Sequence, residues 1–437
     1  MKTALDNFFD LTGLKTNVKR EILAGFTTFI SMAYILFVNP EILGASGMDK
    51  GAVFTATALA SAIGCLLMGL LAKYPIATAP SLGINAFFAY SVCIGMNIPW
   101  QTTLAGVFVA SIIFLLITVF KLRELIIDAI PADLKAAISA GIGLFIAFIG
   151  LQGGGLIVAN KSTLVGLGSF SGSTWVTVFG LIVVSILMVM RVPGAIFIGM
   201  VLSAIFGIAT GNIQMPHAFV APAPSMDQTF LVALSHLKDI NTLQMWVLVI
   251  TFLLVTFFDT AGTLIALAQQ AGFLQNNKMP RVGKALMSDS TAMLFGSLFG
   301  TSPVGAYVES SAGIAVGGRS GLTAVTTGIC FILGLFFSPL LTVATSQVTA
   351  PALIIVGVLM AQSMARITWT KLEIAIPAFL TVAGMPLTYS ISDGLALGFI
   401  AYPITMIAAR KGKEVPALMY VLFFVFVIFF WVLNIEK

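Results

Sequence analysis

The sequence predicts an all-α polytopic membrane protein, arranged as a seven-plus-seven inverted repeat with two broken half-helices that meet as short strands. Three observations predict it: the composition, the spacing of the apolar runs, and proline and glycine motifs that recur in the same order in both halves. Of the 437 residues, 59% are hydrophobic and 9% are charged, and the mean hydropathy is +1.05. Soluble domains carry roughly 25% charged residues. The hydrophobic content excludes a disordered chain, and long non-alternating runs exclude an outer-membrane barrel.

Apolar runs of spanning length recur along the chain. A hydrocarbon core of about 30 Å needs about 20 apolar helical residues, so two runs, 82–94 and 304–317, are too short to cross as continuous helices. The predicted first repeat covers 21–209, with segments at 21–38, 51–72, 82–94, 100–120, 132–150, 174–190 and 193–209. After a polar connector at 210–242, the second repeat covers 243–408, with segments at 243–268, 284–300, 304–317, 321–342, 350–365, 372–389 and 391–408. A further apolar run at 417–434 either crosses as an additional C-terminal helix or packs at the periphery.

The distribution of lysine and arginine orients these segments. Most basic residues flank apolar runs, so the net charge of +5 does not indicate nucleic-acid binding. With residues 1–20 in the cytoplasm and strict alternation, 18 basic residues fall inside and three outside, as the positive-inside rule requires. The inside set is Lys2, Lys15, Lys19, Arg20, Lys73, Lys121, Arg123, Lys135, Arg191, Lys278, Arg281, Lys284, Arg319, Arg366, Lys371, Arg410, Lys411 and Lys413, and the outside set is Lys50, Lys161 and Lys238, with Lys437 uncounted. The connector is therefore predicted to be extracellular.

The internal repeat is weak but in register. An odd number of segments per half means that the second half enters the membrane from the opposite side, which is the inverted repeat of secondary transporters. Residues 80–85 of the third segment correspond to 303–309 of the tenth, and the Pro-Ala pair at 131–132 corresponds to that at 351–352. Glycines at 194 and 199 correspond to those at 394 and 398.

The remaining signals exclude other classes of chemistry. The N-terminus lacks the layout of a cleaved signal peptide, so we expect the first span to direct membrane insertion. Cys65, Cys93 and Cys330 lie in apolar runs without a redox or zinc motif, and we expect free, buried thiols. His217 and His236 lie in the connector and are expected to be solvated. No cofactor and no metal are predicted.

The third and tenth segments are predicted to be broken. Pro75 and Pro80 forbid a continuous helix, and the residue before each proline is pushed toward extended geometry. Residues 76–79 should therefore be extended, with a half-helix beginning near Leu82. The stretch 301–305 repeats this pattern around Pro303. The two stretches can pair as antiparallel strands, and the half-helix N-termini would then point N–H groups into the membrane midplane.

Two carboxylates are predicted to lie deep in the membrane. Asp259 lies about 20 Å along its helix at 1.5 Å per residue, and Glu309 lies in the tenth segment. A carboxylate at such depth costs several kcal/mol unless it is paired or neutralised. A structural ion pair or a local helix cap would be the structural explanation, but no basic residue lies deep in a span. The functional explanation is that both acids accept hydrogen bonds from a ligand, and that one or both carry a proton.

Asn85 and neighbouring aromatic side chains complete the predicted site. Asn85 is the repeat counterpart of Glu309, and its amide offers both a donor and an acceptor; an interhelical hydrogen bond is the structural alternative. Phe87, Phe88 and Tyr307 could stack on a flat ring or simply pack. The predicted ligand-contacting set is Glu309, Asp259, Asn85, Ala86, Phe87, Tyr307, Val308 and Thr263.

At these residues the chain resembles the nucleobase–cation symporters of the nucleobase–ascorbate transporter superfamily, and most closely the adenine–guanine–hypoxanthine permeases. The matching motifs are APSLGINAFF at 79–88, FDTAGTL at 258–264, and GTSP at 300–303 followed by YVES at 307–310 and GGRSGLTAV at 317–325. The resemblance implies core and gate domains, a homodimer, and transport of purine bases with protons. It places the substrate carboxylates at Asp259 and Glu309 and the third-helix amide at Asn85. Uracil-type relatives carry a histidine where this chain has Thr263, which disfavours uracil.

These features together predict proton-coupled uptake of purine bases, hypoxanthine or guanine and with adenine as a further candidate, across the plasma membrane by alternating access. Uracil, xanthine or an inorganic anion remain alternative cargoes of the same fold, and sodium an alternative coupling ion. Two acids disfavour an anion carrier. An intramembrane enzyme would need a nucleophile–base pair or metal ligands within the spans, and a channel would need a filter; neither pattern is visible.

Overall fold

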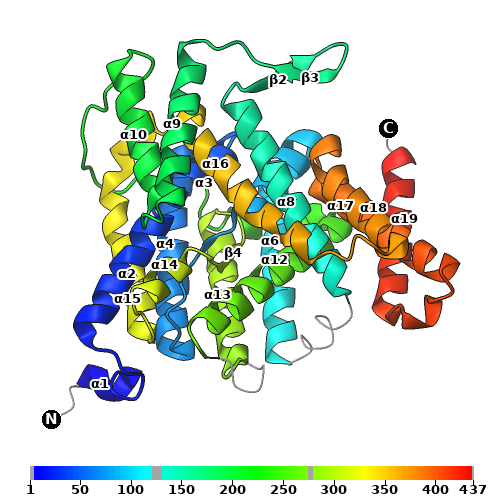
Figure 1. The fold of residues 1–437 in the computed structure, drawn as a ribbon, viewed down its shortest axis with the longest axis horizontal. Helices are drawn as coiled ribbons and strands as arrows, with labels where there is room; N and C mark the ends of the chain where they lie inside the picture. Colours follow the sequence, from blue (N-terminus) through cyan, green and yellow to red (C-terminus); the bar gives the residue numbers. More distant parts are fainter. Residues whose placement is uncertain (1–3, 121–129, 274–278, 436–437) are drawn as a thin grey trace.

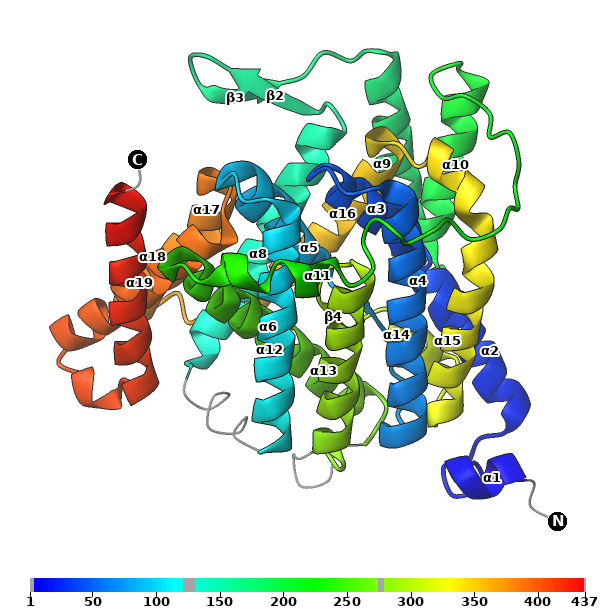
Figure 2. The ribbon, with the colours of Figure 1, turned by 180° about the vertical axis from the view of Figure 1, so that it is seen from behind.

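The computed structural model describes residues 4–120, 130–273 and 279–435. The chain is mainly helical, and Figures 1 and 2 show its helices bundled together. The described residues also form two short antiparallel strand pairs. The first half contains α1 (Ala4–Phe9), α2 (Val18–Met32), α3 (Ile35–Gly44), α4 (Lys50–Leu67), η1 (Met68–Ala72), β1 (Thr78–Pro80), α5 (Leu82–Ala86), η2 (Phe87–Gly95), α6 (Trp100–Val119), α8 (Ala132–Gly153), β2 (Ile157–Asn160), β3 (Leu164–Leu167), α9 (Gly172–Val189) and α10 (Ala195–Ala209). The connector contains α11 (Val232–Ser235) and η3 (Leu237–Ile240). The second half contains α12 (Leu243–Gln270), α13 (Val282–Phe299), β4 (Val304–Ala306), α14 (Ser310–Ala315), α15 (Gly321–Gly334), η4 (Leu335–Val343), α16 (Ser346–Ala361), η5 (Gln362–Arg366), α17 (Leu372–Thr388), α18 (Ile391–Ala408), η6 (Gly412–Glu414) and α19 (Ala417–Ile435).

Each predicted membrane segment contains at least one helix. Within the described residues, nine helical stretches are long and apolar enough to cross a membrane, and four shorter apolar helices accompany them. The third and tenth segments are broken as predicted. The helix α5 begins at Leu82, and the strands β1 and β4, which pair with each other, replace helix in the two segments. The β2–β3 hairpin in the loop after α8 and the short helix α1 were not predicted.

The helices form two groups, which are the core and the gate. In the core, α2 and α4 pack on α15, α4 and α6 pack on α13, and α6 packs on α12. In the gate, α8 packs on α16 and α17, α17 on α18, and α9 on α10 and α16. The core interfaces named above, and the gate interfaces of α8 with α16 and α17 and of α9 with α16, join one half of the chain to the other. The fold is therefore the predicted inverted repeat with core and gate domains.

Two prolines within gate helices keep their helices intact because neighbouring threonines replace the missing backbone bonds. Pro351 cannot donate to the Gln347 carbonyl, and the Thr177 hydroxyl of α9 donates to that oxygen at 3.1 Å. Pro377 likewise leaves the Glu373 carbonyl without its helical donor, and Thr405 of α18 donates to it at 2.8 Å. The prediction that the twelfth segment begins at 350, beside Pro351, is therefore wrong: α16 begins one turn earlier at Ser346.

Two hydrogen bonds join core to gate among the described residues, and both lie on the side predicted to be extracellular. The Ser346 hydroxyl at the start of α16 donates to Glu41 Oε1 of α3 at 2.7 Å, and the other oxygen of Glu41 pairs with Lys50. The Ser91 hydroxyl of η2 donates to the Tyr389 carbonyl at 3.2 Å. Core and gate are thus in contact at their predicted outer ends.

Several sequence-based predictions concern the periphery. The described thiols of Cys65, Cys93 and Cys330 are free, but Cys330 is only partly buried, because it lies on the outward side of α15. The helix α19 packs on α18 at the edge of the fold (Figure 1), and its crossing of the membrane stays a prediction. Lys2, Lys121, Arg123, Lys278 and Lys437 lie outside the described residues.

The topology can be tested with introduced cysteines. The hairpin that carries Lys161 and the N-terminal helix α1 lie at opposite ends of the bundle (Figures 1 and 2). The predicted topology places the hairpin outside the cell and α1 in the cytoplasm. Ser225 in the connector and Gln269 near the end of α12 are both exposed. We expect an impermeant maleimide, applied to intact cells, to label Ser225→Cys and not Gln269→Cys, with the unsubstituted chain as the background control. Labelling of Gln269→Cys alone would reverse the topology.

Candidate functional site

The centre of the candidate site is the antiparallel pair of β1 and β4. Thr78 lies opposite Ala306, and Pro80 opposite Val304. The pair is extended by backbone bonds from Ser81 N to the Pro303 carbonyl at 3.0 Å and from Tyr307 N to the Ala77 carbonyl at 2.9 Å. The predicted strand pairing is confirmed. It satisfies the backbone where neither segment is helical, and it joins the two halves of the chain where the half-helices begin.

Asp259 lies in the middle of α12, beside this strand pair. The Ser81 hydroxyl lies next to its carboxylate. A methyl group added at Gly305 of β4 would meet Ser81 Oγ at 2.7 Å, Thr260 Oγ1 at 3.1 Å and Asp259 Oδ2 at 3.9 Å. Glycine at this position therefore lets α12 approach the strand. Because Asp259 lies in mid-helix, it cannot be the helix cap that the sequence left open.

Glu309 lies just before α14 and is partly buried. Its Oε1 accepts a hydrogen bond of 2.5 Å from the Tyr34 hydroxyl, which comes from the junction between α2 and α3. Tyr307, two residues earlier, donates its own hydroxyl to the Pro80 carbonyl at 3.1 Å. Glu309 makes no side-chain cap to α14. The described ion pairs, Lys50–Glu41 and Lys411–Glu373, lie elsewhere, so within the described chain neither site carboxylate is paired with a base.

Asn85 lies one helical turn after Ser81 and is fully buried. Its Nδ2 donates to Asn39 Oδ1 of α3 at 2.6 Å. Its Oδ1 is buried and has no hydrogen-bond partner among the described residues. The interhelical hydrogen bond that was the structural alternative for Asn85 is therefore present. It uses the amide N–H of Asn85 and leaves the amide oxygen without a described partner.

The other predicted site residues differ in exposure. Ala86 and Phe87 are buried, and the Phe87 ring lies 4.9 Å from that of Phe252 on α12, with Phe88 also packed on Phe252 at 6.4 Å. In this conformation both rings are packed on protein. Val308 is 50% exposed. Thr263, one turn after Asp259, is partly buried.

The N-terminus of α14 differs from the prediction. Its N–H groups were expected to point freely into the midplane. The N–H groups of Ser310, Ser311 and Ala312 instead donate to the carbonyls of residues 307, 308 and 309 at 2.9–3.1 Å. A tight first turn satisfies them, so they are not available to a ligand in this conformation.

Sequence reasoning missed three polar residues around the site. Asp289 of α13 is a third deep carboxylate, fully buried, that accepts from Thr260 Oγ1 at 2.8 Å, so the prediction of two deep acids is wrong. Tyr34 and Asn39 lie in the first segment and contact Glu309 and Asn85. A polar side chain inside an apolar span could have pointed to them. Tyr34 in the first segment and Asp289 in the ninth are such side chains.

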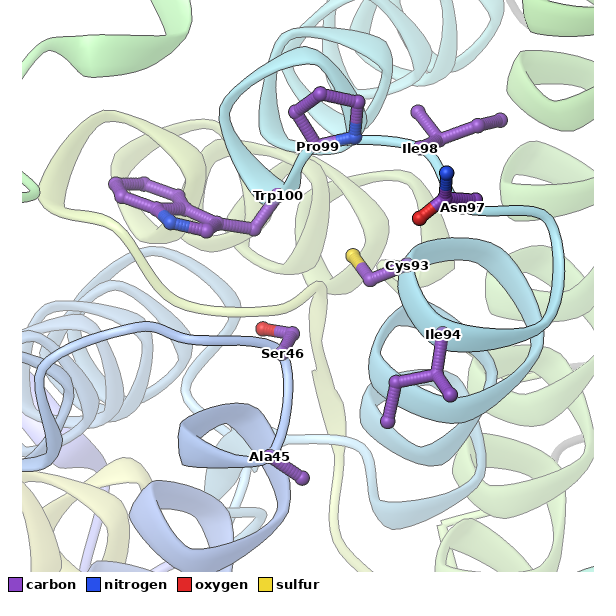
Figure 3. A pocket seen from close by; sticks show the side chains of 8 residues that line it. All are labelled: Ala45, Ser46, Cys93, Ile94, Asn97, Ile98, Pro99 and Trp100. Atoms are coloured by element: carbon purple, nitrogen blue, oxygen red, sulfur yellow. The ribbon is translucent and has the colours of Figure 1, made fainter.

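A surface pocket of about 360 Å³ lies away from these residues. Figure 3 shows Ser46, Cys93 and Trp100 around it, between the loop after α3 and the loop from η2 to α6. None of the predicted ligand-contacting residues lines it. Asp259 and Glu309 therefore do not line this pocket.

Comparison with known proteins adds evidence independent of this geometry. The Permease family matches residues 19–397. The guanine/hypoxanthine permease PbuG of Bacillus subtilis (strain 168) is 54% identical over 98% of this chain and 99% of that protein. The adenine permease AdeP of Escherichia coli (strain K12) is 40% identical over 97% of this chain and 96% of that protein. These relatives are permeases, so the alternative of an intramembrane enzyme is excluded.

Solved structures share the fold at low sequence identity. The transmembrane domain of a cyanobacterium bicarbonate transporter, BicA, aligns with a TM-score of 0.59 and 15% identity, covering 90% of this chain and 97% of that one. Murine Slc26a9, an anion transporter in the inward-facing state, aligns with a TM-score of 0.61 and 12% identity, covering 94% of this chain and 72% of that one. The fold class is confirmed, and the multi-pass membrane character with it. The chain belongs to the Permease family and, as its motifs indicate, to the purine branch of the nucleobase–ascorbate transporter superfamily.

Proposed function

We propose that this protein takes up purine bases, hypoxanthine and guanine with adenine as a further cargo, across the plasma membrane together with protons. The observation that carries the proposal is the presence of two partly buried carboxylates, Asp259 and Glu309, beside the β1–β4 pair. Purines present N–H groups on a flat edge, and carboxylates are the strongest acceptors of such donors. The relatives PbuG, a guanine/hypoxanthine permease, and AdeP, an adenine permease, support the same cargo class.

The proposed coupling follows from the charge of the site. A neutral base cannot use the membrane potential, whereas one proton moved with it gains about 2.3 kcal/mol per 100 mV. Burial favours the protonated form of a carboxylic acid, so an acid that is neutral when loaded and ionised after release can carry the proton. Glu309 is the first candidate, because its segment is broken and can rearrange with the ligand; Asp259 is the second.

The proposed mechanism is alternating access of the core against the gate in a homodimer with a cytoplasmic N-terminus. The bonds from Ser346 to Glu41 and from Ser91 to Tyr389 support it, since they join the two domains at one end of the bundle. On the predicted topology that end is extracellular. Closure there is the arrangement that a carrier open to the cytoplasm requires.

Uptake into proteoliposomes tests the function and its coupling. We expect labelled hypoxanthine to accumulate when a pH gradient, acidic outside, is imposed without sodium, and a protonophore to abolish the accumulation. Unlabelled guanine and adenine should compete, and uracil should not. Accumulation that needs a sodium gradient would recast the two acids as sodium ligands, and competition by uracil or xanthine alone would replace the purine assignment.

A further inference from the structure

The side chain of Asn39 is hydrogen-bonded at every position that an amide offers. Its Nδ2 donates to Thr57 Oγ1 at 2.7 Å and to Thr301 Oγ1 at 2.8 Å. Its Oδ1 accepts from Asn85 Nδ2 at 2.6 Å and from Ser302 Oγ at 3.4 Å. Asn39 is fully buried, and its partners come from α4, from α5 and from the stretch before β4. It therefore ties both broken segments to the first span.

This arrangement fixes which end of the Asn85 amide is occupied. If Asn85 turned over alone, its oxygen would face Asn39 Oδ1, and two acceptors would meet without a proton between them. Asn85 Oδ1 is thereby held away from Asn39 as a buried acceptor without a described partner. A buried acceptor without a partner is unfavourable until a donor reaches it, and a ligand N–H group is a suitable donor.

Three neighbouring side-chain hydroxyls already donate within the protein. Tyr34 donates to Glu309, Tyr307 to the Pro80 carbonyl, and Thr260 to Asp289. The acceptors that we assign to the ligand are the carboxylates of Asp259 and Glu309, and Asn85 Oδ1. An acceptor-rich site discriminates an amino substituent from a carbonyl at the same ring position, because the carbonyl would leave two acceptors opposed.

We propose that Asn39 is a specificity-determining positioning residue: by holding the Asn85 amide with its oxygen free, it makes the site prefer a purine amino group over a carbonyl at one ring position. This inference rests on the proposed purine transport. Asn39 acts through Asn85 and does not contact the ligand itself. Without the Asn39 acceptor, Asn85 can rotate and present its N–H groups, and the preference should disappear.

Two pairs of bases isolate the proposed discrimination. Guanine and xanthine differ by an amino group against a carbonyl at C2, and adenine and hypoxanthine differ in the same way at C6. In the unsubstituted protein, at least one pair should compete for labelled hypoxanthine uptake with a ratio of inhibition constants of about tenfold or more in favour of the amino base. In Asn39→Leu, which has a similar volume and no polar atoms, that ratio should fall to within about threefold. The pair that changes identifies the ring position that Asn85 contacts.

Further variants separate positioning from packing. Asn39→Asp keeps the acceptor for Asn85 Nδ2, and the Thr57 and Thr301 hydroxyls can turn to donate to it, so the ratio should be retained. Ser61→Ala removes a buried hydroxyl of α4 that donates to the carbonyl of residue 57 and leaves every Asn39 bond in place, so it is the matched control. If Asn39→Leu fails to reach the membrane, Asn39→Ser, whose hydroxyl is too short to reach Asn85, replaces it.

The outcomes separate this inference from the proposed function. If the unsubstituted protein takes up no purine, the proposed function fails. If it takes up purines but Asn39→Leu or Asn39→Ser lowers the affinity for all bases in proportion, with the ratios unchanged, Asn39 only packs and the inference is overturned. Loss of the ratio in Asn39→Asp as well would also overturn it, because the acceptor for Asn85 would then not be what matters.

Discussion

Replacing Glu309 with glutamine should lower purine uptake about 10- to 100-fold while the protein still reaches the membrane. Glutamine keeps the shape of the side chain and a carbonyl that can accept from Tyr34, but it puts an NH₂ group where a ligand N–H needs an acceptor. A hydrogen bond to a charged group contributes about 1.5–3 kcal/mol, and 1.36 kcal/mol corresponds to a factor of ten. Initial rates of labelled hypoxanthine uptake, normalised to membrane protein, measure the effect.

The matched control for this prediction is Glu373→Gln. Glu373 pairs with Lys411 at the surface of the gate, away from both broken segments, and exposed ion pairs contribute little. Its uptake should match that of the unsubstituted chain. Normal uptake by well-expressed Glu309→Gln, with an unchanged dependence on the pH gradient, would remove Glu309 from the site.

Replacing Glu21 with alanine should destabilise the core severely. Glu21 of α2 is a fully buried carboxylate that accepts from Arg319 N at 2.9 Å, Ser320 N at 3.1 Å, Ser320 Oγ at 2.7 Å and Thr323 Oγ1 at 2.6 Å. Alanine leaves these buried donors unsatisfied at about 1–3 kcal/mol each, so we expect a total loss of at least about 3 kcal/mol. The melting temperature of the detergent-solubilised protein, followed by size-exclusion chromatography after heating, should fall clearly.

Glu21 accepts hydrogen bonds from the loop at Arg319 and Ser320, which follows α14, the half-helix that begins after Glu309. The substitution is therefore expected to affect the region around Glu309 as well as the stability of the core. Glu21→Gln, which keeps one acceptor oxygen, should be intermediate in melting temperature. An unchanged melting temperature for Glu21→Ala would mean that water replaces the carboxylate and that the loop does not depend on it.

The sequence was sufficient for most of the fold because its signals are local. Pro75, Pro80 and Pro303 interrupt otherwise apolar runs, and the antiparallel pairing of β1 with β4 followed from their matching places in an inverted repeat. The start of α16 could not be predicted in the same way. A proline ends a helix only if its freed carbonyl lacks another donor, and Thr177, which supplies that donor, is more than 160 residues away.

The candidate site shows the same limit. Asp259 and Glu309 could be singled out because a carboxylate in an apolar span is costly in isolation. The orientation of Asn85 could not, because it depends on Asn39, Thr301 and Ser302, which meet only after the first, third and tenth segments pack together. Asp289 was overlooked because α13 is less apolar than its neighbours, so an acid there stands out less.

The hydrogen bonds from threonines to the carbonyls that Pro351 of α16 and Pro377 of α17 leave free bear on where the protein can bend. A proline in a membrane helix is usually a place of weakness, because one backbone bond is missing and the helix can flex there. In the gate, Thr177 and Thr405 of adjacent helices donate to the carbonyls freed by Pro351 and Pro377. Each of these hydrogen bonds links two helices and stiffens the pair. We therefore expect the gate to be stiff at these two positions. The other places where the regular helix is interrupted are the junction between α2 and α3 at Tyr34 and the two strand-interrupted segments, and these belong to the core and contact Asp259 or Glu309.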